Sequence, residues 1–133
     1  MTEIEHIRPD GMANAPTYTH VVASRSERIV HISGQIAIDA DGKVVGKGDL
    51  AAQTEQVMEN LKTALTAAGA TFDDVVKITT FIVDYVPEHR AVVGEVRGRY
   101  LSAENPPAST LVGISALAGP DWLIEIEATA VTD

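Results

Sequence analysis

The chain has 133 residues, the length of one domain, and such a domain buries roughly two thirds of the surface that its unfolded form exposes. Hydrophobic residues make up 45% and charged residues 22% of the chain, shares that exclude disordered, collagen-like and coiled-coil proteins. Cysteine is absent, which excludes disulfides, thiol nucleophiles and zinc-thiolate sites. We therefore expect a single domain spanning residues 1–133.

The formal net charge of −9 bears on the class of partner, because an acidic surface repels phosphate backbones and anionic membranes. Basic residues are scattered, and the aromatic share of 5% leaves few surfaces on which bases would stack. The apolar runs are too short to span a bilayer, and residues 1–5 lack the features of a signal peptide. These observations predict a cytoplasmic protein that binds neither nucleic acid nor membranes.

The first half of the chain predicts strands followed by a helix. Residues 28–38 are β-branched and nearly alternating after a polar turn at 25–27, and two strands fit within residues 24–38. Residues 41–42, Asp-Gly, have the chemistry of a tight turn and predict a short hairpin into Val44-Val45. Asp49 is expected to cap a helix that stops at Gly69. Its apolar positions follow the 3.6-residue period: Leu50, Val57, Met58, Leu61, Ala64, Leu65 and Ala68.

The second half repeats the alternation. Residues 75–84 predict a strand. Pro87 is expected to start a helix that Asn105-Pro106-Pro107 ends, and two more strands follow at 109–115 and 122–132. The buried stripe of that helix is expected to consist of Val92, Val93, Val96 and Tyr100. The order of elements predicts an α+β fold in which two helices cover one face of a mixed sheet.

Strong catalytic motifs are missing: the chain has no GxGxxG, Walker loop, HExxH or GxSxG. The four histidines, His6, His20, His31 and His89, fall on separate predicted elements without metal-ligand spacing. We therefore expect no metal site. His31 is expected to face a polar seam, and His20 to be a partly buried histidine.

Two acidic residues share one face of the last predicted strand. Glu125 and Glu127 are two positions apart and lie on the same face as Thr129, whereas the intervening residues are apolar. Such a pair is usually a solvated face. A carboxylate near a subunit interface is also a candidate general acid or base if burial raises its pKa, so both interpretations stay open.

Five fragments in the same order and spacing resemble the Rid (YjgF) family. They are Ser33-Gly34-Gln35-Ile36, residues 53–61 (QTEQVMENL), Ala67-Ala68-Gly69-Ala70 with residues 73–77 (DDVVK), Pro107-Ala108-Ser109-Thr110 and residues 124–128 (IEIEA). The resemblance covers almost the whole chain. It implies a chorismate-mutase-like α+β domain of the bacillary type, a homotrimer around a central barrel, and a small-molecule pocket at each subunit interface. It also implies a hydrolase of the enamine/imine deaminase type that works without cofactor.

The resemblance also implies roles for individual residues. Tyr18 corresponds to the pocket tyrosine of the family, and Ser33 and Gly34 to the backbone wall of the pocket. Glu125 matches the carboxylate that positions or activates the attacking water. Hydrolysis of a C=N bond needs a proton delivered to nitrogen and another taken from water, and Tyr18 and Glu125 are candidates for these two roles.

One position departs from the family pattern. Deaminating members carry an arginine after Pro-Ala that binds the substrate carboxylate, and this chain has Ser109 there. Ser109, Thr110 and Leu111 remain candidate substrate-binding residues, with Leu111 giving the pocket an apolar floor. Arg97 and Arg99 are candidates to replace the missing guanidinium, although their position on the second predicted helix favours a solvated face.

The sequence therefore predicts an atypical trimer that hydrolyses a small enamine, imine or related metabolite other than the usual carboxylate-anchored one. The alternative is a non-catalytic trimer that binds or senses a small molecule. An endoribonuclease is opposed by the acidic balance of the chain.

Overall fold

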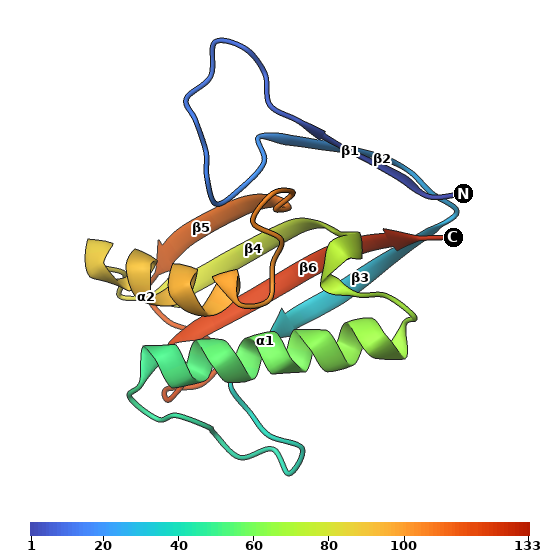
Figure 1. The fold of residues 1–133 in the computed structure, drawn as a ribbon. Helices are drawn as coiled ribbons and strands as arrows, with labels where there is room; N and C mark the ends of the chain where they lie inside the picture. The colour runs from blue at the N-terminus through green and yellow to red at the C-terminus, as the bar shows by residue number, and fades with distance from the viewer.

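The computed structural model describes residues 1–133 and contains one four-stranded sheet with two helices on one of its faces (Figure 1). The strand order is β3-β6-β4-β5. The bounds of these strands are β3 Arg28–Gln35, β4 Val75–Val83, β5 Ala108–Ile114 and β6 Ile124–Thr132. Strand β6 is antiparallel to both of its neighbours, and β4 is parallel to β5. The predicted α+β fold with a mixed sheet is confirmed.

Helix α1 (Leu50–Ala67) has the boundaries that the sequence predicts. The carboxylate of Asp49 accepts the backbone N–H of Ala52 at 3.1 Å, which caps the first turn. The helix ends before Gly69, whose φ of 75° is a conformation that glycine adopts without steric cost. Four predicted apolar positions are buried against the sheet: Val57, Met58, Leu61 and Leu65.

Gln53 is fully buried on α1, although the apolar pattern does not include it. Its Nε2 donates to the carbonyls of Gly46 at 3.2 Å and Asp121 at 2.9 Å, and its Oε1 accepts the N–H of Leu123 at 2.9 Å. The amide thus joins the loop before α1 to the turn before β6. Burial of this polar side chain is tolerated because its donors and acceptor are satisfied.

The hairpin predicted around residues 41–42 is present in a shorter form. The N–H of Gly42 donates to the carbonyl of Asp39 at 3.0 Å in the turn, and the two arms form a single antiparallel bridge, between Ile38 and Val44. The side chain of Asn60 on α1 donates to the carbonyls of Ile36 and Ile38, at 3.0 and 2.9 Å. Because the helix takes up these backbone acceptors, they do not extend the pairing between the two arms, and the hairpin stays short.

Helix α2 (Pro87–Gly98) starts at the predicted proline but ends well before Asn105, which corrects the predicted stop. After Gly98 the N–H of Tyr100 donates to the carbonyl of Arg97, a tightened turn that closes the helix. Glycine and this tightened turn therefore end the helix before the prolines are reached. Tyr100 lies outside the helix, where its ring packs against Phe72 at 5.6 Å between centroids.

A separate two-stranded sheet is formed by β1 (Glu3–Ile7) and β2 (Val21–Arg25). Of the two strands expected within residues 24–38, only β3 lies there in full, which corrects that prediction. Strand β2 contributes only Ser24 and Arg25 to this range, and it pairs with β1 instead of with β3. Neither helix is long and apolar enough to cross a membrane.

The loop between β1 and β2 arches away and returns beside β5 (Figure 1). Thr19 fixes this return: its hydroxyl donates to the carbonyl of Pro106, and its N–H donates to the carbonyl of Pro107 at 3.2 Å. The residues just before Thr19 are thereby held at the edge of the main sheet.

Alternation along the strands separates two sheet faces. On β4, Ile78, Thr80 and Ile82 are fully buried under the helices. Ser109 is level with Ile78 and Leu111 with Thr80 in the parallel pair, so both face the helices as well. We call the opposite side, which carries the odd-numbered residues 77–81 of β4, the open face.

Candidate functional site

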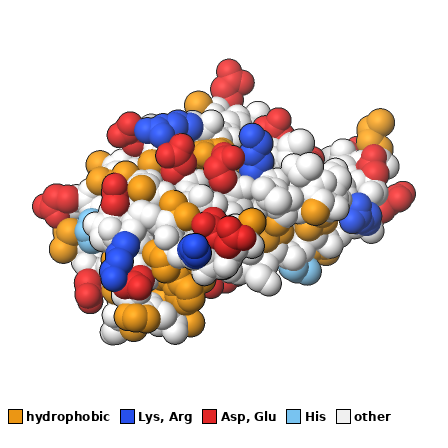
Figure 2. All heavy atoms as spheres, turned by 90° about the horizontal axis from the view of Figure 1, so that it is seen from below, with side chains coloured by type: hydrophobic (Ala, Val, Ile, Leu, Met, Phe, Trp, Pro, Cys, Tyr) orange, Lys and Arg blue, Asp and Glu red, His pale blue; other side chains and the backbone are white.

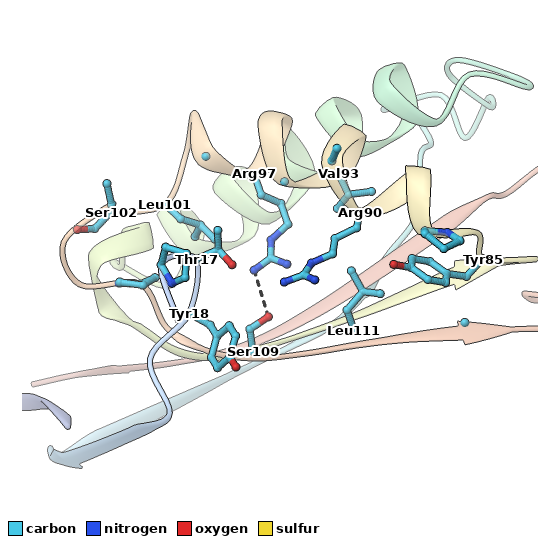
Figure 3. Close-up of a pocket in the computed structure, with 18 residues that line it drawn as sticks. Thr17, Tyr18, Tyr85, Arg90, Val93, Arg97, Leu101, Ser102, Ser109 and Leu111 are labelled. Carbon is cyan, nitrogen blue, oxygen red and sulfur yellow. Dashed lines mark hydrogen bonds between the residues drawn. The ribbon is translucent and has the colours of Figure 1, made fainter. Parts of the chain in front are cut away.

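A cavity of about 860 Å³ lies between α2, β5 and the loop before β2 (Figure 3). Three predicted site residues line this cavity: Tyr18, Ser109 and Leu111. Tyr18 is far from the other two in the sequence. Thr19 explains the convergence, because its two hydrogen bonds to the residues before β5 hold Tyr18 beside that strand. The ring of Tyr18 lies next to Ser109, with its hydroxyl directed away from α2 (Figure 3).

Arg97 reaches from α2 into the cavity, which corrects the expectation that it lies on a solvated face. Its Nη2 donates to the hydroxyl of Ser109 at 3.2 Å (Figure 3). Arg99, the other candidate, does not line the cavity and instead forms an exposed ion pair with Glu95 at 3.2 Å. A guanidinium is therefore present at Ser109, but it comes from the helix instead of from the strand.

The surroundings of Arg97 are unusual for a charged side chain. Its Nε is buried and has no hydrogen-bond partner, and burial lowers the pKa of its guanidinium. No Asp or Glu lines the cavity, whereas a second arginine, Arg90, does. In a chain with nineteen acidic residues, the cavity carries two cations and no anion. This charge distribution suits an anionic ligand.

Helical spacing connects the residues that the sequence interpretation missed. Arg90, Gly94, Arg97 and Leu101 recur at intervals of four, three and four residues, and all line the cavity. This spacing is present in the sequence. An apolar helical pattern does not include these positions, because two of the four residues are charged and one is glycine.

The remaining predicted site residues lie on the open face. Glu125 alternates with the buried Ile124 and Ile126, and in the sheet it is paired with Phe81. Its side chain packs over Gly34, where an added Cβ would lie 2.7 Å from its Cδ. Ser33, before a bulge in β3, is exposed. Within one chain, therefore, Glu125 and Gly34 form a group that is separated from Ser109 by the thickness of the sheet.

The open face also holds Thr110, whose hydroxyl accepts from Nζ of Lys77 at 2.6 Å, together with Glu127 and Thr129. The structure thus separates Thr110 from its sequence neighbours Ser109 and Leu111. His31 is exposed on β3. His20 is half-buried, with its Nε2 2.8 Å from the carbonyl of Ala13 and its ring edge-on to Tyr18. No three His, Asp or Glu side chains lie together as a metal site requires.

The acidic and basic side chains are mixed on the face shown in Figure 2. Lysine and arginine side chains stand apart from one another there, with carboxylates between them, and they form no basic stripe. A nucleic-acid backbone needs such a stripe for several simultaneous phosphate contacts. This face does not provide one.

Comparisons with known proteins agree with this architecture. Residues 10–132 match the family model described as endoribonuclease L-PSP. The Myxococcus xanthus protein DfrA is 40% identical over 115 residues, covering 86% of this chain and 85% of that protein. The 3-aminoacrylate deaminase RutC of Acinetobacter baylyi is 35% identical over 126 residues, covering 95% of this chain and 96% of that protein.

A solved structure of a Rid-family protein from Yersinia pestis, titled as being of unknown function, superposes with a TM-score of 0.90. It is 42% identical to this chain, and the match covers 96% of this chain and 98% of that one. The family model spans nearly the whole sequence, and the fold extends over the same length. The chain therefore belongs to the Rid (YjgF) family.

Proposed function

We propose that this protein hydrolyses a small enamine or imine to the corresponding carbonyl compound and ammonia. The observation that carries the proposal is the convergence of Tyr18, Ser109 and the guanidinium of Arg97 on one cavity. The cavity volume of about 860 Å³ is in the range of small-molecule sites. The relative named as a 3-aminoacrylate deaminase supports the same class of reaction.

The chemistry sets what the site must supply. Water adds to the imine carbon, a proton reaches the nitrogen, and the C–N bond of the resulting carbinolamine breaks to release ammonia as the C=O bond forms. An enamine first gains a proton at carbon and loses one from nitrogen to become the imine. Glu125 is the candidate for taking the proton from water, and Tyr18 is the candidate for donating to nitrogen.

The separation of Glu125 from the cavity requires a second subunit in this proposal. We propose the homotrimer that the family resemblance implies, in which the open face of one subunit supplies Glu125 and Gly34 to the cavity of its neighbour. Strand β5 is suited to that contact because it is an edge strand of the sheet and carries cavity residues on one face only. A closed cyclic assembly gives every subunit the same contact.

Turnover of a panel of enzymatically generated imines tests the proposed reaction. We expect faster release of ammonia with protein than without it for at least one imine, and loss of the acceleration in Glu125→Gln. An absence of acceleration across the panel, together with measurable binding of the carbonyl products, would support the non-catalytic binding trimer instead. Sedimentation equilibrium gives the assembly directly, with an expected mass of about three chains.

Mixed trimers test the shared site. Arg97→Gln and Glu125→Gln subunits are each expected to be inactive alone. Co-expressed with two different tags and purified through both, the mixed trimers are expected to regain part of the activity, because some interfaces combine an intact cavity with an intact Glu125. Complete inactivity of the mixed trimers would contradict a site built from two subunits.

A further inference from the structure

We propose that Arg97 and Arg90 form a two-cation site for a dicarboxylate, with Arg97 and Ser109 binding the carboxylate beside the reacting carbon and Arg90 binding the second one. The ligand class rests on the proposed function only in that the dicarboxylate is taken to be a substrate. The site itself is supported by the position and charge of Arg97 and of Arg90 in the cavity.

The first cation is Arg97. A guanidinium has five N–H donors, and that of Arg97 makes one side-chain hydrogen bond, to Ser109. Its Nε is buried without a partner, and leaving a charged donor in that state is costly. The hydroxyl of Ser109, which accepts from Arg97, still has its own proton to donate. Together these groups present a fork of donors that matches the two oxygens of a carboxylate.

The second cation is Arg90, two helical turns before Arg97. Seven residues correspond to roughly 10 Å along a helix axis. Both side chains nevertheless extend from α2 toward β5 in the same cavity (Figure 3). Arg90 forms no salt bridge, unlike Arg25 and Arg99, which are paired with Glu3 and Glu95. Two cations and no anion of the same chain line this cavity, and a ligand with two anionic groups supplies both counter-charges.

The room in the cavity agrees with a ligand of this size. A three-carbon acid fills only a small part of about 860 Å³. Leu111, on β5, gives the cavity an apolar lining that suits a short methylene chain. A dicarboxylate of about five carbons would place its ends on different guanidinium groups, which a monocarboxylate cannot do.

Calorimetric titration with two 2-oxo acids of equal carbon number tests the proposal. The probes are 2-oxoglutarate, with two carboxylates, and 2-oxopentanoate, with one. We expect the dicarboxylate to bind about 10-fold more tightly, since one extra charge-assisted contact contributes about 1.4 kcal/mol. Arg90→Gln should bring the two affinities together, and Arg97→Gln should weaken both about 10-fold or more. Arg99→Gln, at the residue that follows the end of α2 and outside the cavity, is the matched control and should change neither.

Two further variants separate anion binding from folding. Arg97→Met keeps the apolar stem and removes the buried cation, so it should retain the melting temperature while losing affinity for both acids. Arg97→Gln combined with Ser109→Arg should regain affinity for 2-oxopentanoate, because a guanidinium returns from the strand. Loss of folding in both single Arg97 variants would assign Arg97 to the core and overturn the proposal.

Equal binding of the two acids by the native protein would also overturn it. These titrations need no turnover. A protein that binds dicarboxylates through Arg97 but hydrolyses no imine would contradict the proposed reaction and leave the two-cation site standing. A protein that hydrolyses only uncharged imines would support the proposed reaction and contradict the two-cation site.

Discussion

The carboxylate of Glu125 occupies the space that a side chain at position 34 would take, and Gly34 leaves that space open. An ideal Cβ on Gly34 would lie 2.7 Å from Cδ and 2.9 Å from Cγ of Glu125. The backbone of β3 thus determines where the carboxylate lies on the open face. A substitution at Gly34 therefore changes the position of the Glu125 carboxylate and leaves the charge of Glu125 in place.

We therefore expect Gly34→Ala to push the Glu125 carboxylate aside and to lower kcat on the order of 10- to 100-fold, as misplacement of a catalytic group by about 1 Å does. Steady-state kinetics on a responsive imine measures the effect. Because the displaced group is the flexible end of a side chain, the free energy of unfolding should change little. Added to Glu125→Gln, the same substitution should have little further effect on kcat, and full additivity would contradict this link.

Gln53 leads to a prediction about stability. Gln53→Met removes three hydrogen bonds and leaves the N–H of Leu123 and two carbonyls without this partner. We expect the free energy of unfolding to fall by about 2–4 kcal/mol, measured by urea denaturation. Gln56→Met is the matched control, since Gln56 bonds only to Asn60, and it should cost under about 1 kcal/mol. Equal losses in the two variants would contradict the joining role of Gln53.

Thr80 leads to a prediction of the opposite sign. Its hydroxyl is buried beneath the helices and has no hydrogen-bond partner. Thr80→Val keeps the shape and removes an unpaired polar group, so we expect the unfolding free energy to rise by about 1 kcal/mol. Thr79→Val, on the other face of the same strand, should give a smaller change. A destabilised Thr80→Val protein would mean that the hydroxyl has a partner.

Tyr100 should make stability depend on alkaline pH. Burial, and then a hydrogen bond with Glu59, raise the pKa of its phenol to about 12. The folded protein therefore holds this proton more tightly than the unfolded chain, whose phenol has the ordinary pKa of about 10. The stabilisation is complete below pH 10 and is lost as the pH rises toward 12. Urea unfolding at several alkaline pH values should show this decline, and Tyr100→Phe should flatten it, whereas Tyr18→Phe should not.

The family description as an endoribonuclease makes RNA binding worth measuring. A chain with a net charge of −9 must overcome repulsion before contacting a phosphate backbone, so we expect no binding of labelled single-stranded RNA at micromolar concentrations in physiological salt. Submicromolar affinity that falls steeply with added salt would reveal a basic surface formed only on assembly.

Helix α1 and the mixed α+β architecture could be predicted where local signals and long-range packing agree, whereas the strand order could not. Asp49 and Gly69 mark the ends of α1 by the chemistry of capping, and the structure confirms both. The turn at residues 41–42 could be predicted because Asp-Gly favours it locally, but the shortness of the hairpin could not. Two carbonyls of its first arm accept from Asn60, which lies on a helix far away in the sequence.

The candidate site was predictable only in pieces. Tyr18, Ser109 and Leu111 meet in the cavity because Thr19 bonds to the residues before β5, a contact that no local pattern encodes. Glu125 was placed correctly on the polar face of its strand, but strand alternation alone does not show which face holds the cavity. Arg97 was misjudged because helical charge is normally solvated.

Arg97 and Ser109 lie on consecutive elements of one β–α–β crossover, in which α2 connects the parallel strands β4 and β5. The donor fork and the strand beneath it are therefore encoded in one short stretch of the gene, about residues 75–114. We therefore expect an exchange of that stretch with a relative to transfer both guanidinium groups of the proposed two-cation site together. Positions 97 on the helix and 109 on the strand can then change in a correlated way, because both contribute to the same part of the cavity.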